Sequence, residues 1–429
     1  MKYNICMILL LINSVAVYNQ TTFNLIPNIN IEGAMGKMEI INLSQFVSNI
    51  RYIRLETKKD VIISGISDCI FFGNQILITN LRECLLFANN GSFIRKIGSQ
   101  GRGPGEYQYV VNAGADSHNK IYIQSLRDLL EYRPDGTFVK AYRNLFMFNN
   151  NLNDYFSKWI ILRDSLIFGH IPNNAGNGNM KALLINKYGD IIKQYKNYDL
   201  FEIAKNSVRR SSDKEAHIYW FKNTVYYKGP NNDTLFSLDN QYNLIPVYIF
   251  NLGKYKEPVY ERGIQVGKQF TNKYLSISNV FQTQNYLFIC CRFGDHFPAK
   301  RLTPKVLKLP GGEVRNVWIN TDMVLGVYDK RTGKMSFCSP TSTDNPLFTT
   351  GFYNDVDAGP RFFPMKQVND STMVMWVDSK QLKDHIASEE FKNAKPLYPE
   401  KKEELKHLAD SLSEYDNPVL MFVTFKSEK

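Results

Sequence analysis

The chain of 429 residues is 44% hydrophobic and 13% aromatic, and its formal net charge is +11. This composition supplies a sizeable apolar core and excludes an intrinsically disordered protein. Basic runs such as residues 208–214 are short and mixed with acids, which argues against a nucleic-acid partner, whereas an anionic glycan or a membrane surface stays compatible with the charge.

The N-terminal segment has the pattern of a secretory signal peptide. Lys2 precedes an apolar run over residues 5–12, and Ser14 and Ala16 have the small-x-small spacing of a cleavage site. We predict a signal peptide over residues 1–16 and export to the periplasm or the cell surface, with a retained signal anchor as the alternative. Later segments do not reach about 18 consecutive apolar residues, so no transmembrane helix is predicted in the mature chain.

Cysteine usage indicates neither a metal site nor a redox centre. The five cysteines beyond the leader form no C-x-x-C pair, so zinc and thioredoxin-like chemistry are not predicted. Cys69 and Cys84 could bridge neighbouring strands, and buried free thiols are an equal alternative. The five are Cys69, Cys84, Cys290, Cys291 and Cys338.

Internal repeats predict the fold. Residues 73–98 align with residues 118–143 as strand, strand, turn and strand, and Gly91 and Gly136 hold the same place in the turn. Further copies follow, with a period of about 40 to 50 residues, which is typical of β-propellers with four-stranded antiparallel blades. Five units are recognisable and a sixth is partial. We therefore predict an all-β, six-bladed propeller whose last blade is completed by the N-terminal strand over residues 49–57.

The C-terminal end combines a helix with a strand. Residues 399–415 place Leu405, Leu408 and Leu412 on one helical face, and a short apolar strand follows. The predicted domains are thus the propeller over residues 17–398 and a segment over residues 399–429 that packs on it.

The glycine-rich stretch over residues 97–107, IGSQGRGPGEY, is interpreted as a corner and not as a phosphate cradle. Its glycine spacing matches neither nucleotide-binding pattern, and strand-forming residues follow it instead of a helix. The stretch joins the outermost strand of one repeat to the innermost strand of the next. It therefore opens on the face that carries the inter-blade connections, here called the loop face. Arg102, Glu106 and Tyr107 are candidate ligand-binding residues. The alternative is that Arg102 and Glu106 anchor their own loop.

A second loop, over residues 341–364, enters the last blade on the same face. It offers Asp355, Asp357 and Arg361 as ligand-binding candidates. The D-x-D spacing alone lacks the further ligands of a calcium loop, so no metal is predicted. Asp355 and Glu106 could serve as paired acids only if they lie about 5 to 9 Å apart, and an Asx-turn network that holds the blade closure is the alternative.

Three segments carry a resemblance to a known family. Residues 98–107 (GSQGRGPGEY), residues 357–364 (DAGPRFFP) and residues 414–426 (EYDNPVLMFVTFK) resemble a family of exported bacterial six-bladed β-propellers, which are related in shape to NHL-repeat propellers. The resemblance implies the fold and export. It implies no particular activity, because most members have none assigned. Many members are lipoproteins, and the leader of this chain departs from that pattern.

These features predict an exported, non-catalytic propeller that binds a glycan, peptide or protein ligand through the loop face around the central channel. No cofactor is expected. One alternative is a carbohydrate-active hydrolase or lyase whose site is assembled from dispersed Glu, Asp and Arg residues. Another is a structural component of a cell-envelope assembly, for which residues 399–429 would be the docking element.

Overall fold

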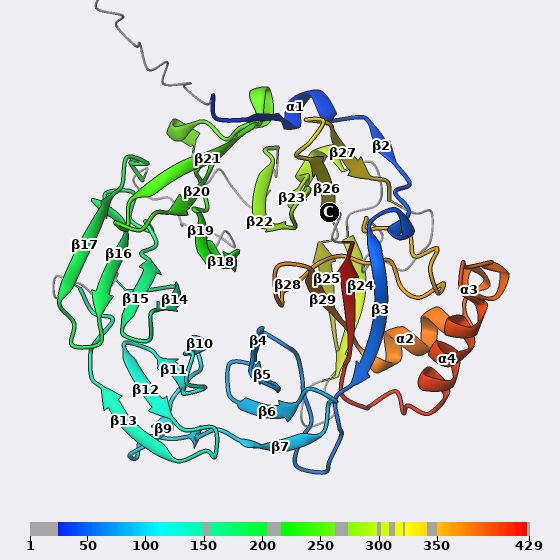
Figure 1. The fold of residues 1–429 in the computed structure, drawn as a ribbon, viewed down its shortest axis with the longest axis horizontal. Coiled ribbons are helices and arrows are strands. Elements are labelled where there is room, and N and C mark those ends of the chain that lie inside the picture. Colours follow the sequence, from blue (N-terminus) through cyan, green and yellow to red (C-terminus); the bar gives the residue numbers. More distant parts are fainter. Residues whose placement is uncertain are drawn as a thin grey trace, which may run out of the picture.

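The computed structural model describes residues 25–148, 155–203, 216–261, 273–297, 302–308, 314–320, 322–340 and 350–426, with the backbone alone for residues 302–308 and 314–320. Six sheets of four or five strands follow one another along the chain and form a ring (Figure 1). Their innermost strands line a central channel. The six-bladed propeller predicted from the repeats is therefore confirmed.

The first three blades are four-stranded antiparallel sheets whose innermost strand comes first in the chain (Figure 1). Blade one contains β4 (Asp68–Phe72), β5 (Gln75–Thr79), β6 (Cys84–Ala88) and β7 (Phe93–Lys96). Blade two contains β10 (Asn112–Ala115), β11 (Ile121–Ser125), β12 (Asp128–Tyr132) and β13 (Phe138–Tyr142). Blade three contains β14 (Lys158–Leu162), β15 (Leu166–His170), β16 (Met180–Asn186) and β17 (Ile191–Lys196).

The next two blades each gain a parallel fifth strand from the N-terminal segment. Blade four contains β18 (His217–Phe221), β19 (Thr224–Lys228), β20 (Thr234–Leu238) and β21 (Leu244–Asn251), with β1 (Asn28–Asn30) on β21. Blade five contains β22 (Ser276–Gln282), β23 (Tyr286–Arg292), β26 (Met323–Asp329) and β27 (Met335–Cys338), with β2 (Met38–Glu39) on β27. The N-terminal segment thus runs along the rim of two blades before it closes the ring (Figure 1).

The sixth blade joins the two ends of the chain. Its strands, from the channel outwards, are β28 (Lys366–Gln367), β29 (Thr372–Val377), β30 (Val419–Phe425) and β3 (Val47–Arg54). The predicted N-terminal strand is therefore the outermost strand of the last blade, as expected. The C-terminal strand differs from the prediction that residues 399–429 pack on a finished ring. It is the third strand of the sheet and pairs with β29 on one side and β3 on the other. Without β30, the backbone groups at the facing edges of β29 and β3 would have no hydrogen-bonding partner in the sheet.

Short helices occupy the connection between β29 and β30. The predicted helix that begins at Pro399 corresponds to α4, which buries Leu405 and is followed by the buried Leu412. Among the described residues, no helix has the length and apolar character needed to cross a membrane. The helices and 3-10 turns are α1 (Ile31–Ala34), η1 (Leu43–Gln45), η2 (Gly253–Tyr255), η3 (Val259–Glu261), η4 (Gly294–His296), α2 (Ser379–Ala387), α3 (Glu389–Asn393) and α4 (Pro399–Asp410).

The connections divide between the two faces of the ring. Each blade is entered from the loop face, so the connection between its second and third strands opens there too. Three additions to the repeat lie on the loop face. Helices α2 to α4 in blade six and a hairpin in blade five lie between the second and third strands of their blades. A short parallel pair lies in the stretch over residues 97–107, which joins blades one and two. The hairpin is β24 (Leu302–Lys308) with β25 (Val314–Asn320), and the parallel pair is β8 (Ser99–Gln100) with β9 (Glu106–Tyr107).

The hydrophobic core consists of six clusters, one between each pair of neighbouring blades. Alternate residues of a strand face opposite neighbours, as the period of two requires. In β5, Ile76 and Ile78 pack towards blade six, while Leu77 packs towards blade two. The blades are therefore stabilised by contact with one another.

The same alternation explains the state of the cysteines. Cys69 lies in the cluster between blades six and one, and Cys84 lies in the cluster between blades one and two. The two thiols are on opposite faces of one sheet, so they cannot form a disulfide, and the alternative of buried free thiols is correct. All five cysteines are free and buried.

Candidate functional site

The stretch over residues 97–107 is a stiff corner between blades one and two. Gly101 N donates to Tyr107 O at 3.0 Å, and the Tyr132 hydroxyl donates to Gly105 O at 2.8 Å. Gly105 has a φ of +74°, and a Cβ atom at this residue would lie 2.8 Å from the Phe138 ring. The stretch leads into strand β10, and this is the arrangement expected of a corner.

Tyr107 belongs to the core beneath this corner. Its side chain is 2% exposed and packs in the cluster between blades one and two, and its hydroxyl accepts a hydrogen bond from Cys84 N at 3.3 Å. Burial raises the pKa of the phenol above its usual range. Tyr107 therefore anchors the loop from below, whereas the sequence had suggested that it faces a ligand.

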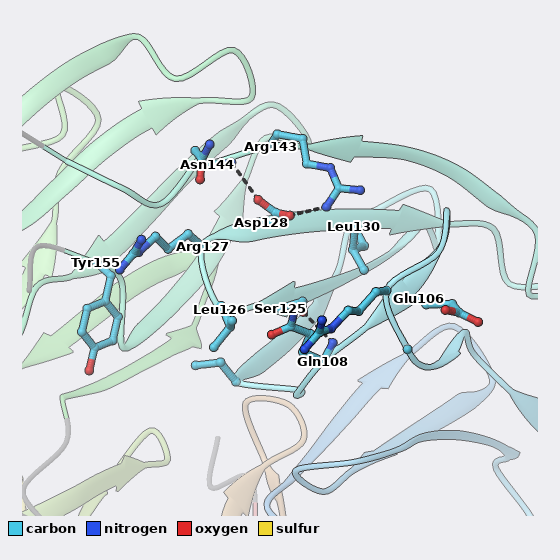
Figure 2. Close-up of a pocket in the computed structure, with 13 residues that line it drawn as sticks. Glu106, Gln108, Ser125, Leu126, Arg127, Asp128, Leu130, Arg143, Asn144 and Tyr155 are labelled. Carbon is cyan, nitrogen blue, oxygen red and sulfur yellow. Dashed lines mark hydrogen bonds and ion pairs between the residues drawn. The ribbon is translucent and has the colours of Figure 1, made fainter. Parts of the chain in front are cut away.

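Arg102 and Glu106 line a cavity of about 600 Å³ above blade two (Figure 2). The walls come from residues 101–111, from the turn between β11 and β12 with the start of β12, and from the connection between β13 and β14. Topology brings these three segments to the loop face. Two of the three candidates in the glycine-rich stretch thus share a cavity with residues that sequence reasoning did not identify, among them Arg127, Asp128 and Arg143.

The acids of this cavity are already engaged by the protein. Glu106 Oε2 accepts from Gly103 N at 2.7 Å. Asp128 forms an ion pair with Arg143 and accepts from Asn144 N at 2.8 Å (Figure 2). Among the described residues, no carboxylate pairs with Arg102 or Arg127. The cavity therefore presents an excess of positive charge.

Asp355 and Asp357 hold the closure of the ring. Asp355 accepts from Ser44 N at 2.9 Å and from the Ser44 hydroxyl at 2.5 Å. Asp357 is 1% exposed and accepts from Asn354 Nδ2 at 2.6 Å, from Gly359 N at 2.8 Å and from the Tyr52 hydroxyl at 3.2 Å. Burial raises the pKa of Asp357.

Arg361 lies in the same closing loop. Its guanidinium carbon is 5.2 Å from the centre of the Tyr353 ring, and its Nε is buried without a hydrogen-bond partner among the described residues. Burial lowers the pKa of this group. The three candidates of the second loop thus occupy a structural junction between η1, β3 and the last blade, and Asp355 does not line the cavity that contains Glu106.

A second polar site, which sequence reasoning missed, lies in the central channel. A cavity of about 820 Å³ is lined by residues from all six innermost strands. Five of these strands begin with a polar residue that lines it, and we call these residues the channel ring. The channel ring consists of Asp68, Asn112, Lys158, His217 and Lys366.

The channel ring is joined across the channel by ion pairs. Asp68 accepts from Lys158 Nζ at 3.1 Å and from Lys366 Nζ at 2.6 Å, so blade one is linked to blades three and six. Burial opposes ionisation of Asp68, but the two ammonium groups outweigh it and hold its pKa below the usual range. Burial and the same two lysines lower the pKa of His217 to about 3.

One further cluster has metal-ligand residue types. Ligand atoms of Asp116, His118 and Asp164 lie within 4.8 Å of one another in turns opposite the loop face. Both carboxylates already accept hydrogen bonds: Asp116 from Lys120 N and the Tyr122 hydroxyl, and Asp164 from Ser117. These bonds account for the cluster as turn structure.

The ring of six sheets, with its elaborated loop face and polar channel, defines a six-bladed β-propeller. Residues 26–424 match the family described as "Domain of unknown function (DUF4934)". The chain belongs to this family.

A solved structure supports the fold. The chain is similar to a Bacteroides fragilis protein that is described as exported, with 17% identity, a TM-score of 0.61, and coverage of 94% of this chain and 99% of that chain. It also matches a member of the duf4221 family from Bacteroides vulgatus, with 8% identity, a TM-score of 0.49, and coverage of 91% and 99%. No curated protein matches the chain.

Proposed function

We propose that this protein is an exported, non-catalytic binding protein that takes an acidic saccharide in the cavity above blade two. The signal-peptide pattern over residues 1–16 supports export. The similarity to a Bacteroides fragilis protein that is described as exported supports it as well. Binding through the loop face follows the general use of propeller loops as recognition elements on a rigid scaffold.

The charge pattern of the cavity carries the proposal. Arg102 and Arg127 have no carboxylate partner among the described residues, while Glu106 and Asp128 are held by backbone amides and Arg143. A guanidinium group recognises a carboxylate through two parallel hydrogen bonds. A ligand with a carboxylate would therefore complete the pairing that the protein leaves open.

The remaining surface of the cavity suits the body of a sugar. Tyr155 lies beside Arg127 at one end of the cavity (Figure 2). Leu126 and Val111 line it with exposures of 48% and 40%. Apolar ring faces of a saccharide pack on such aromatic and aliphatic surface, whereas the carboxylate pairs with the arginines. The stiff backbone of residues 97–107 keeps this arrangement in place without a ligand, which lowers the ordering cost of binding.

Calorimetric titration of the leaderless protein tests the proposal. Tetragalacturonate is compared with the uncharged galactose tetrasaccharide of the same length. We expect the acid to bind and the neutral sugar to bind at least tenfold more weakly. Arg102→Ala should weaken tetragalacturonate binding about tenfold or more, since a charge-assisted hydrogen bond contributes roughly 1.5 to 3 kcal/mol. Arg133→Ala is the matched control, because Arg133 is exposed in the turn between β12 and β13 and does not line the cavity.

Two results would contradict the proposal. Equal binding of both tetrasaccharides, or equal loss in Arg102→Ala and Arg133→Ala, would show that the arginine pair does not recognise a carboxylate. Release of new reducing ends from tetragalacturonate, abolished in Glu106→Gln, would instead make the protein a hydrolase or lyase.

A further inference from the structure

The central channel offers a site that is separate from the cavity above blade two. The channel ring lies where the innermost strands begin, which places it at the loop-face end of the channel. Five of the six blades contribute to it, so the site exists only when the ring is closed. No residue lines both cavities.

The acid of the channel ring is not available to bind a cation. Asp68 Oδ1 accepts from Lys366 Nζ and from Cys69 N at 2.9 Å, and Asp68 Oδ2 accepts from Lys158 Nζ. The Asp68 side chain is 14% exposed, whereas the Lys158 and Lys366 side chains are 23% and 30% exposed. Among the described residues, one carboxylate faces two ammonium groups at this end of the channel, which is an excess of one positive charge.

The other polar members of the channel ring are donors. Asn112 is 6% exposed, and its Nδ2 is buried without a hydrogen-bond partner among the described residues. Leaving such a group unpaired costs about 1 to 3 kcal/mol. His217 Nδ1 accepts from Val280 N at 3.2 Å, so the neutral ring carries its hydrogen on Nε2 and can donate from there. The ring therefore needs acceptor atoms and one negative charge.

Beyond the channel ring, the wall of the cavity becomes aromatic. Phe71, Trp159, Trp220 and Trp376 line it, and Trp220 is 42% exposed. At the end of the channel opposite the channel ring, Asp370 accepts a hydrogen bond from Lys222 N at 2.8 Å. The volume of about 820 Å³ is large enough for a small organic molecule.

We propose that the channel is a second binding site, which takes a small organic carboxylate with its head at the channel ring and its apolar body along the aromatic wall. A monovalent carboxylate matches the single excess charge, and its oxygens supply acceptors for Asn112 Nδ2 and His217 Nε2. An uncharged ligand with a carbonyl oxygen could still accept from Asn112 Nδ2, but it would leave the excess charge unbalanced.

Tryptophan fluorescence reads this site directly, because three of the four tryptophans in the chain line the cavity. The leaderless protein is titrated with acetate, hexanoate and phenylacetate, and with phenylacetamide as the uncharged counterpart. We expect saturable changes with hexanoate and phenylacetate, weaker binding of acetate, and at least tenfold weaker binding of phenylacetamide than of phenylacetate.

Variants assign the effect to the channel ring. Lys366→Met removes a charge with little change in volume, and Asn112→Asp replaces the buried donor with an acid; each should weaken phenylacetate binding at least tenfold. Lys334→Met is the matched control, because that side chain is 72% exposed in the turn between β26 and β27. If Lys366→Met does not fold, as judged by circular dichroism, Asn112→Asp decides the matter.

Arg102→Ala should bind phenylacetate like the parent protein, so a failure of the loop-face proposal and a failure of this one are distinguishable. The channel proposal is overturned if none of the three carboxylates gives a saturable change. It is also overturned if phenylacetamide binds as tightly as phenylacetate, or if Lys334→Met loses as much affinity as Asn112→Asp.

Discussion

Stability should fall as the pH drops from about 6.5 towards 4, and His170 should account for a measurable part of the loss. His170 is 4% exposed, its Nδ1 lies 2.9 Å from the Tyr227 hydroxyl, and burial lowers its pKa to about 4. An unfolded chain binds a proton at an ordinary histidine pKa of about 6.5. Between these values the unfolded state holds more protons than the folded state, so stability must rise with pH.

The size of the effect follows from the shift. Each pKa unit corresponds to about 1.4 kcal/mol, so His170 lowers the free energy of unfolding by about 3 kcal/mol between pH 7 and pH 4. Urea denaturation at pH 7, 6 and 5 measures the slope for the parent protein and for His170→Asn. The slope of the variant should be smaller by about 1 kcal/mol per pH unit.

His407→Asn serves as the control, because that side chain is exposed on α4. It should leave the slope unchanged. Identical slopes for the parent protein and His170→Asn would refute the claim that His170 is neutral in the folded protein.

Three further predictions concern the ring itself. Gly136→Ala should lower the free energy of unfolding, measured by urea denaturation, by about 1 to 2 kcal/mol, because the φ of Gly136 is +83°. Gly91→Ala should lower it more, because a Cβ atom at Gly91 would lie 2.0 Å from the Arg54 carbonyl oxygen. Equal losses would contradict this expectation. Deletion of residues 419–429 should abolish cooperative unfolding, whereas deletion of residues 427–429 should not, since only the first removes β30 from the middle of blade six. The five buried cysteines, whose pKa values burial raises, should resist a disulfide thiol reagent until the leaderless protein is unfolded, and rapid labelling of the native protein would contradict the burial.

The deletion experiment also bears on the idea that the C-terminal segment docks to an envelope assembly. Because β30 completes a sheet, loss of binding after removal of residues 399–429 would report unfolding and not loss of a docking element. Substitutions on the exposed surface of α4 are the appropriate test.

The fold could be predicted from the sequence because the repeat leaves local evidence. Gly91 and Gly136 both mark a turn with positive φ between the third and fourth strands of a blade. The strand over residues 49–57 was the natural partner for an incomplete last blade. The order of strands within that blade was not predictable, because a short apolar strand such as β30 reads the same whether it packs on a sheet or belongs to one.

The sites were predictable only in part, for a related reason. Arg102 and Glu106 are close in sequence to the glycines that shape their loop, so the stretch itself drew attention to them. The channel ring has no such marker. Asp68, Lys158 and Lys366 each come from a different blade, and the repeats have different residues at this position. Comparing the first residue of every innermost strand would have revealed the ring.

The distribution of chain length between the two faces supports binding at the loop face. Turns on the opposite face are short: residues 73–74 join β4 to β5, and residues 133–137 join β12 to β13. On the loop face, residues 378–418 join β29 to β30, and residues 339–365 lead into β28. A blade needs only a few residues to make these connections, and each additional ordered residue costs about 1 to 2 kcal/mol of conformational entropy. Helices α2 to α4 offset part of that cost by burying Leu382, Phe391 and Leu405 against blade six. Stability alone gives no reason for additions to accumulate on one face, whereas recognition by that face does. Helices α2 to α4 would serve such recognition away from the two cavities, because they line neither of them.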